Sequence, residues 1–115
     1  MRRLDRVRTL SASEKELLRD LKGVIARFVP NATVILYGSA ARGKRDPESD
    51  YDILILLDKL PPRQTLEEMR SAIYDLELER EAVLSVMTST QDDWNSPLRR
   101  VSPYHKNVER EGVLL

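Results

Sequence analysis

The sequence predicts an α/β (α+β) fold, in which helices pack on a small mixed sheet of about three to four strands. Three short runs rich in apolar and β-branched residues, at 33–37, 50–57 and 82–87, alternate with segments whose apolar residues recur at helical spacing. The 115 residues, 41% of them apolar and 33% charged, have the composition of a globular protein. We therefore expect a single domain over residues 1–115.

The first helix is expected behind a capping-box pattern, Ser13-x-x-Glu16. The apolar residues that follow at helical spacing are Leu17, Leu18, Leu21, Val24, Ile25 and Phe28. Pro30 ends this segment, because proline lacks the amide hydrogen that a helix interior needs. The pattern predicts an amphipathic helix with one buried face.

Two strands are expected on either side of a polar segment from Ser39 to Ser49. Residues 33–37 are apolar and rich in β-branched side chains, and Gly38 follows them directly. Residues 50–57 begin with alternating polar and apolar side chains and then become continuously apolar. This change is typical of a central strand whose first residues face an open site.

A second helix is expected from another capping-box pattern, Thr65-x-x-Glu68, to about Glu79. Its apolar stripe consists of Leu66, Met69, Ile73 and Leu76. Residues 82–87 then predict the third strand, since they are again short, apolar and bounded by polar residues.

The last quarter of the chain gives weaker patterns. Residues 91–94 predict one helical turn, and Ser102 before Pro103 predicts the start of a helix that Gly112 ends. We expect Trp94 to pack over an edge of the core and His105 to lie on the surface.

Composition excludes several chemistries. The chain has no cysteine and one histidine, which excludes disulfides, thiolate nucleophiles and histidine-rich zinc sites but is compatible with a hard metal ion bound by carboxylates. The longest apolar run, residues 53–57, is far shorter than the roughly 20 residues that span a bilayer. No secretory signal is evident at the N-terminus. We therefore expect a cytoplasmic protein that does not associate with a membrane.

Charge is unevenly distributed. The basic residues at the start of the chain are Arg2, Arg3, Arg6 and Arg8. Lys and Arg together number 19, as do Asp and Glu, so the net charge is zero. A neutral domain lacks the basic surface usual for nucleic-acid binding, so we do not expect direct contact with nucleic acid. We expect the basic start to be a frayed, solvated terminus.

Two acidic residues at the entrance of the second strand carry the strongest chemical signal. Asp50 and Asp52 are two residues apart, and in an extended chain such residues point to the same face with Cα atoms roughly 6.5–7 Å apart. Their carboxylates can therefore converge on one hard cation or bridge two. Two such ions suit in-line phosphoryl displacement.

A phosphate-binding turn is expected directly after the first strand. Gly38 allows a ligand to approach the backbone, and the Ser39 hydroxyl with the amides of a following helical turn can donate hydrogen bonds to phosphate oxygens. Arg42 adds a cation nearby. Together with the two aspartates, this turn predicts a site for a magnesium-bound nucleotide.

These residues resemble the signature of a known family. The runs Gly38-Ser39-Ala40-Ala41-Arg42-Gly43 and Ser49-Asp50-Tyr51-Asp52 resemble the GSxARG…SDxD motif of minimal nucleotidyltransferases, which belong to the DNA polymerase β-like superfamily. The order of predicted elements agrees with that fold over most of the chain. The ending, residues 107–114, also resembles the close of many such small proteins. The resemblance implies a single minimal nucleotidyltransferase domain over residues 1–115.

The resemblance implies a role for each motif residue. Gly38 and Ser39 are expected to hold the nucleotide phosphates, and Arg42 and Ser49 to complete the nucleotide-binding set. Asp50 and Asp52 are expected to be the catalytic residues and to coordinate the catalytic Mg²⁺, with two ions expected. ATP, or another NTP, is the expected substrate.

The family normally supplies a third carboxylate from a later strand, which binds metal or accepts the proton of the attacking hydroxyl. Residues 82–87 contain no acid, and Ser85 occupies the position most nearly equivalent. Three interpretations remain open: Glu81 replaces the acid after a change of register, another chain provides it, or the base is lost.

The resemblance therefore implies a magnesium-dependent transfer of NMP, AMP from ATP above all, to a hydroxyl of a protein partner. Many minimal nucleotidyltransferases resemble antitoxins paired with an all-helical HEPN ribonuclease toxin, so a HEPN-type partner is expected. One alternative is a weak or inactive nucleotide-binding module that neutralises its partner by forming a complex. Another is modification of a small molecule such as an antibiotic, in a pocket completed by a homo-oligomer.

Overall fold

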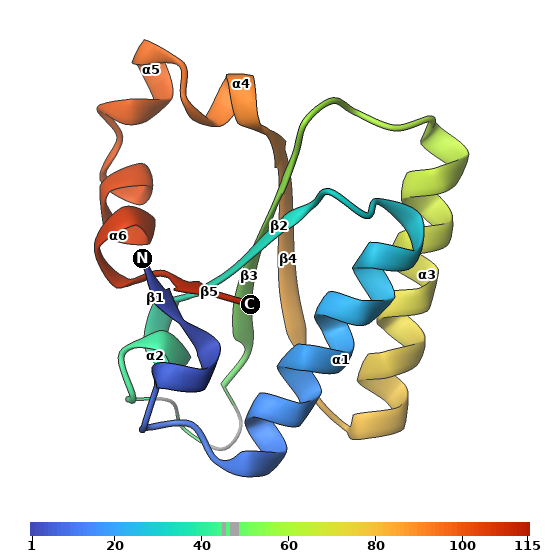
Figure 1. Ribbon diagram of the computed structural model, residues 1–115, viewed down its shortest axis with the longest axis vertical. Coiled ribbons are helices and arrows are strands. Elements are labelled where there is room, and N and C mark those ends of the chain that lie inside the picture. The colour runs from blue at the N-terminus through green and yellow to red at the C-terminus, as the bar shows by residue number, and fades with distance from the viewer. Residues whose placement is uncertain (45, 47–48) are drawn as a thin grey trace.

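The computed structural model describes residues 1–44, 46 and 49–115 (Figure 1). The elements in chain order are β1 (Arg2–Arg3), η1 (Leu4–Arg6, a 3₁₀ turn), α1 (Ala12–Phe28), β2 (Thr33–Tyr37), α2 (Gly38–Ala41), β3 (Tyr51–Leu57), α3 (Arg63–Arg80), β4 (Leu84–Thr90), α4 (Gln91–Trp94), α5 (Pro97–Arg100), α6 (Pro103–Glu111) and β5 (Val113–Leu114). Among the described residues, no helix has the length and apolar character needed to cross a membrane.

The strands form one mixed sheet in the order β1-β5-β2-β3-β4. β2 is antiparallel to both β3 and β5, whereas β3 is parallel to β4 and β1 is parallel to β5. This arrangement confirms the predicted mixed sheet with helices packed on it. The sheet has five strands instead of the three to four predicted, and the two that no sequence pattern located are β1 and β5. Each has two residues, too few to show a periodic pattern, and each forms by pairing with a distant segment.

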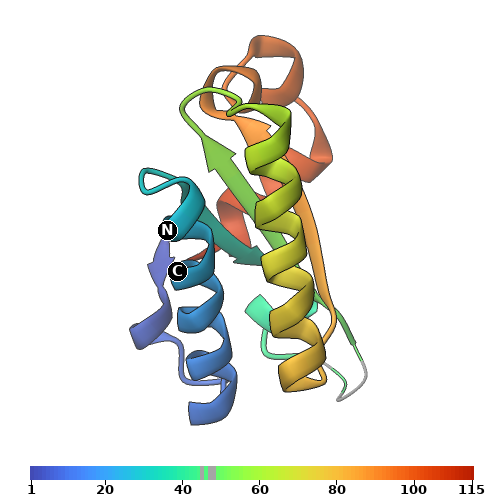
Figure 2. The ribbon, with the colours of Figure 1, turned by 90° about the vertical axis from the view of Figure 1, so that its right-hand side faces the viewer.

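The two faces of the sheet carry different clusters of apolar side chains. On one face, α1 and α3 cover alternate residues of β3, among them Ile53, Ile55 and Leu57 (Figure 2). On the other face, Leu54 and Leu56 pack with side chains of α4 and α6. Since side chains alternate along a strand, Asp52 belongs to the same face as Leu54.

Helix ends differ from the predicted ones in two places. The capping box of α1 is formed by Ser11 and Glu14 rather than by Ser13 and Glu16, because the helix begins at Ala12. Helix α3 begins at Arg63, and its N-cap residue, Pro62, offers no side-chain hydrogen bond. The capping box predicted at Thr65 is therefore wrong, because that residue already lies inside the helix.

The later elements largely agree with the sequence patterns. α4 spans the predicted residues 91–94, and α6 has Ser102 as its N-cap and Gly112 as its C-cap. The third strand, β4, runs from Leu84 to Thr90 rather than over residues 82–87. The shift arises because α3 continues to Arg80 and closes on Glu81 in a left-handed conformation, so the strand starts later.

Two predictions about individual residues are corrected by tertiary packing. His105 is buried, with 7% of its surface exposed, and its ring stacks on Trp94, which is itself buried as predicted. The basic start of the chain is not frayed: Arg2 and Arg3 form β1, and the Arg2 guanidinium donates to the carbonyl of Ala41 at 2.7 Å. His105 stacks on Trp94 and Arg2 bonds to Ala41, and neither partner is a near neighbour in the sequence.

Candidate active site

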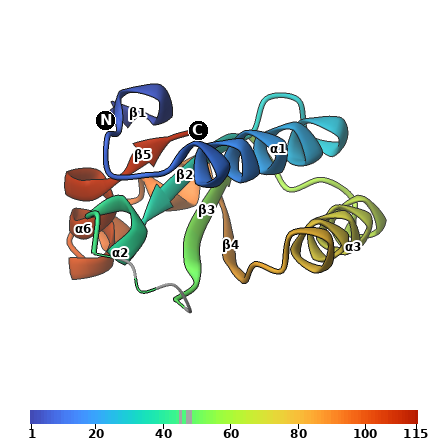
Figure 3. The same ribbon diagram turned by 90° about the horizontal axis from the view of Figure 1, so that it is seen from below.

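The glycine turn and the acidic strand meet at one end of the sheet. Tyr37 is paired with Asp52 in the antiparallel register, and Gly38 follows Tyr37 as the first residue of α2. A methyl group built at Gly38 would lie 2.2 Å from Oδ2 of Asp52, so the glycine backbone packs directly against this carboxylate. Seen from below, α2 lies beside the start of β3 (Figure 3). The structure therefore brings Gly38 and Asp52 together, as the spacing predicts.

The other predicted site residues surround this contact. Asp50 is exposed and lies immediately before β3, while Ser49 is half-buried and donates its backbone N–H to the carbonyl of Asp46 at 2.9 Å. Ser39 is the second residue of α2 and is half-buried. Arg42 is the C-cap of the same short helix. Residues 45, 47 and 48, in the loop before Asp50, lie outside the described residues.

Asp52 has an electrostatic environment that favours its protonated form. Burial raises the pKa of its carboxyl group above the ordinary range, and the negative charges of Asp50 and Glu111 raise it further. The guanidinium of Arg42 acts in the opposite direction. Excess negative charge is thus concentrated around Asp52.

Glu111, at the end of α6, is a site residue that the sequence patterns did not single out. Its Oε1 accepts the backbone N–H of Gly38 at 3.0 Å, and its two carboxylate oxygens accept from Nη1 of Arg42 at 3.2 and 3.0 Å. Only 10% of the Glu111 side chain is exposed. The sole signal in the sequence was the family-like ending at residues 107–114, which does not show where that segment docks.

The strand β4 does not supply a third carboxylate. In the parallel register Ser85 lies directly opposite Asp52, the position where such an acid is expected. Glu81 is exposed and lies before β4, at the end of α3. No group of three histidine, cysteine or acidic residues suited to a metal ion occurs among the described residues, so Glu81 does not join the two aspartates.

Comparison with known proteins agrees with this geometry. Residues 18–112, which include the glycine turn, both aspartates and Glu111, match the nucleotidyltransferase domain family. The chain belongs to this family. Such nucleotidyltransferases generally use a nucleoside triphosphate and a divalent metal ion. The match confirms the resemblance drawn from the two motifs.

A more specific relative comes from Methanocaldococcus jannaschii. Its name is "putative protein adenylyltransferase", and it is 40% identical over 60 residues, which are 50% of this nucleotidyltransferase and 58% of the relative. The matched part thus spans little more than half of the relative's length.

The residues of this nucleotidyltransferase fit a magnesium-bound nucleotide. Carboxylate oxygens are the ligands that Mg²⁺ prefers, and the raised pKa of Asp52 marks a place where a cation relieves repulsion between acids. The Asp52 carboxylate can lie against the turn because residue 38 has no side chain. Arg42 supplies a cation beside it, held by Glu111.

Proposed function

We propose that this nucleotidyltransferase is a magnesium-dependent enzyme that transfers AMP from ATP to a hydroxyl of a protein partner. The contact between Gly38 and Asp52 carries the proposal, because the turn proposed to bind phosphate lies directly against the carboxylate proposed to bind the metal. The name of the Methanocaldococcus jannaschii relative supports a protein as the acceptor.

Each site residue has a distinct role in the proposal. Asp50 and Asp52 hold the magnesium ions, which neutralise phosphate oxygens and lower the pKa of the acceptor hydroxyl when bound. Ser39 and Arg42 hold the β- and γ-phosphates. The single N–H of Gly38 is already bonded to Glu111, whereas Arg42 contacts Glu111 through Nη1 and a guanidinium has five N–H donors. The role of Gly38 is to leave room for the Asp52 carboxylate, because it has no side chain. Ser49 fixes the approach of the loop to Asp50 through its backbone hydrogen bond.

The reaction forms one bond and breaks one. The acceptor oxygen bonds to the α-phosphorus, and the bond from that phosphorus to the bridging oxygen breaks, so that pyrophosphate leaves. Ser39 and Arg42 keep the leaving group in line with the incoming oxygen. The proton of the acceptor passes to solvent, because the residue opposite Asp52 is an exposed serine instead of a carboxylate.

The partner in this proposal is a HEPN-type ribonuclease that the transfer inactivates, in the cytoplasm. The family resemblance of the two motifs supports it. Modification of a small alcohol is the alternative acceptor.

The test uses the chain co-expressed with the protein encoded by the neighbouring gene. With Mg²⁺ and ATP labelled in the α-phosphate, label is expected on the partner, and with ATP labelled in the γ-phosphate none is expected. Asp50→Asn and Asp52→Asn should each abolish labelling, whereas Asp75→Asn, on the exposed side of α3, should not. Transfer of the γ-label, or full labelling by Asp52→Asn, would contradict the proposal.

A second function is favoured by Ser85, namely a nucleotide-binding module that neutralises its partner by complex formation alone. A tight complex without any label, unaffected by Asp52→Asn, would support it. Ser85→Asp distinguishes the two: if the chain is a slow transferase, an acid opposite Asp52 should raise the labelling rate at least tenfold. No change in rate would favour the binding module.

A further inference from the structure

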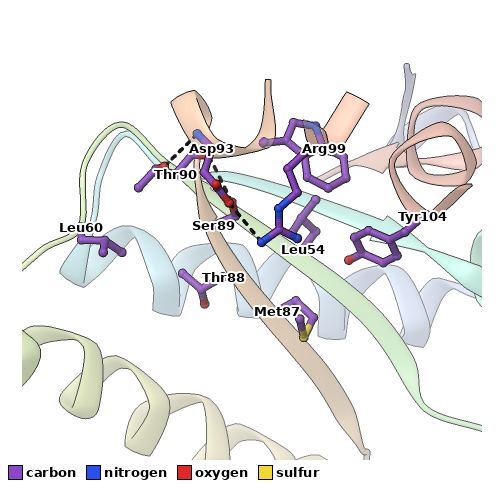
Figure 4. A pocket seen from close by; sticks show the side chains of 10 residues that line it. Leu54, Leu60, Met87, Thr88, Ser89, Thr90, Asp93, Arg99 and Tyr104 are labelled. Carbon is purple, nitrogen blue, oxygen red and sulfur yellow. Dashed lines mark hydrogen bonds and ion pairs between the residues drawn. The ribbon is translucent and has the colours of Figure 1, made fainter. Parts of the chain in front are cut away.

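A pocket of about 250 Å³ lies between β4 and the C-terminal helices (Figure 4). Its floor includes Leu54 and Met87, and its walls include Asp93, Arg99 and Tyr104. None of its lining residues belongs to the two sequence motifs. It shares a sheet face with Asp52, because Leu54 in its floor and Asp52 point to the same side of β3.

The register of β3 and β4 connects the pocket to the proposed metal site. Asp52 is opposite Ser85, and two residues further along the strands Leu54 is opposite Met87. Side chains two residues apart share a face and are roughly 6.5–7 Å apart. The pocket therefore begins two residues beyond Asp52 along β3, on the side that leads toward the C-terminal end of β4.

The geometry of the proposed reaction determines which part of the substrate extends in that direction. The leaving pyrophosphate lies on the side of β2 and α2, so an in-line acceptor arrives from the opposite side, over the exposed edge at β4. The ribose leaves the α-phosphate across this line, and the direction along the strands keeps it over the sheet face that Asp52 shares with Leu54. In one direction the strands end at Tyr51, and in the other they lead into the pocket.

The lining of the pocket suits a flat heteroaromatic ring. Met87 and Tyr104 offer apolar and aromatic surface, and more than half of the Met87 surface is exposed. Arg99 pairs with Asp93 at 3.3 Å, so a cation and a carboxylate stand side by side at the wall (Figure 4). Such a pair offers both donors and an acceptor to the edge of a base. The pocket is smaller than the roughly 300–1,000 Å³ of clefts for drug-sized ligands, which suits one ring system.

Tyr104 also links the pocket to the acidic site. Its hydroxyl donates to that of Tyr37 at 3.1 Å, and the two rings meet edge to face. Tyr37 is in turn paired with Asp52 across β2 and β3. The wall of the pocket and the metal-binding strand are therefore held in a fixed relation.

We propose that this pocket binds the nucleobase of the donor nucleotide. The inference rests on the proposed function, because it takes the position of the phosphates from it. Met87, Arg99 and Tyr104 then contribute affinity for the nucleoside and none for the phosphates.

The test compares two ligands by calorimetry in the presence of Mg²⁺: ATP and inorganic tripolyphosphate. The wild-type chain is expected to bind ATP at least tenfold more tightly than tripolyphosphate. Met87→Ala and Arg99→Ala, both at largely exposed side chains, should weaken ATP three- to tenfold and leave tripolyphosphate unchanged. Leu98→Ala, at a residue 82% exposed and outside the pocket, is the matched control.

The outcomes separate the two proposals. Equal affinity for both ligands, or variants no weaker for ATP than Leu98→Ala, would overturn the nucleobase pocket and leave the nucleotidyl transfer standing. If the pocket variants change only the KM for the acceptor in the transfer assay, the pocket binds the acceptor, and nucleobase binding is overturned as well. Failure of both ligands to bind the wild-type chain would overturn the proposed function together with it.

Discussion

At the residue scale, the conformation of Gly38 decides whether the site exists. Its φ is +78°, in the left-handed region where a side chain is strained, and its Cα faces the carboxylate of Asp52. The positive φ and the nearby carboxylate both disfavour a Cβ at residue 38, since that atom would have to displace the Asp52 side chain. Any other residue here would adopt a strained backbone conformation and push the Asp52 carboxylate aside.

Gly38→Ala is expected to destabilise the protein by about 1–3 kcal/mol, because it adds backbone strain and a clash. The measurement is urea unfolding followed by circular dichroism. Gly23→Ala is the control: Gly23 lies within α1, a Cβ there meets nothing within 4 Å, and the change should stabilise by about 0.5–1 kcal/mol. Equal stability of the Gly38 variant and the wild type would show that the turn does not have this geometry.

Asp52 should reduce the stability of the metal-free protein at neutral pH. Its pKa is raised in the folded state by burial first and then by Asp50 and Glu111. A carboxyl group with a raised pKa stabilises the fold below its unfolded pKa of about 3.9 and loses that contribution as pH rises through the folded value. Asp52→Asn, which stays neutral, should therefore melt at a higher temperature than the wild type at pH 7.

The pH dependence of that difference checks its cause. Both proteins have a neutral side chain at position 52 in acid, so the gap between their melting temperatures should shrink as pH falls toward about 3.9. Asp75→Asn serves as control, because Asp75 is exposed on α3. A gap that persists unchanged in acid would attribute the effect to packing of the amide.

At the element scale, Glu111 fastens the end of α6 to the start of α2. It accepts hydrogen bonds from the backbone of Gly38 and from Arg42, and directly after it β5 pairs with β2. The last helix therefore supports the glycine turn, although the two are 73 residues apart in the chain. This contact makes α6 part of the site rather than only a cover of the sheet.

Glu111→Ala is expected to cost about 1.5–3 kcal/mol, the range for hydrogen bonds with a charged partner. Alanine has a high helix propensity, so the loss is attributable to the two partners left behind. Glu79→Ala, at an exposed position of α3, should change stability by less than about 0.5 kcal/mol. Thermal melts of the three proteins give the comparison, and equal melts for both variants would show that the contact is not formed.

The elements that the sequence predicts best are those whose signal is local. Residues 33–37 form a strand over the predicted range, and the N-cap serine and C-cap glycine of α6 stand where expected. The starts of α1 at Ala12 and of α3 at Arg63 were placed wrongly. In α1, Ser11 and Ser13 are each followed by glutamate at the same spacing, and α3 begins after Pro62, which matches no capping-box pattern. The choice between such positions depends on which turn packs against the sheet.

At the scale of the whole molecule, the same strands serve both apolar clusters and the site. Odd-numbered residues of β3 pack under α1 and α3, while Asp52, Leu54 and Leu56 face the other side. The acidic site and the pocket thus lie next to each other on one sheet face, and the Tyr104 hydroxyl in the pocket wall bonds to that of Tyr37.

The sequence by itself determined the fold class, the positions of most strands and helices, and the glycine turn and acid pair with their spacing, because these depend on contacts between neighbouring residues. Tertiary structure alone decided that Glu111 joins the site, that Arg2 and Arg3 pair with β5, and that His105 is buried. Those outcomes depend on how segments far apart in the chain dock against one sheet, which no local pattern records.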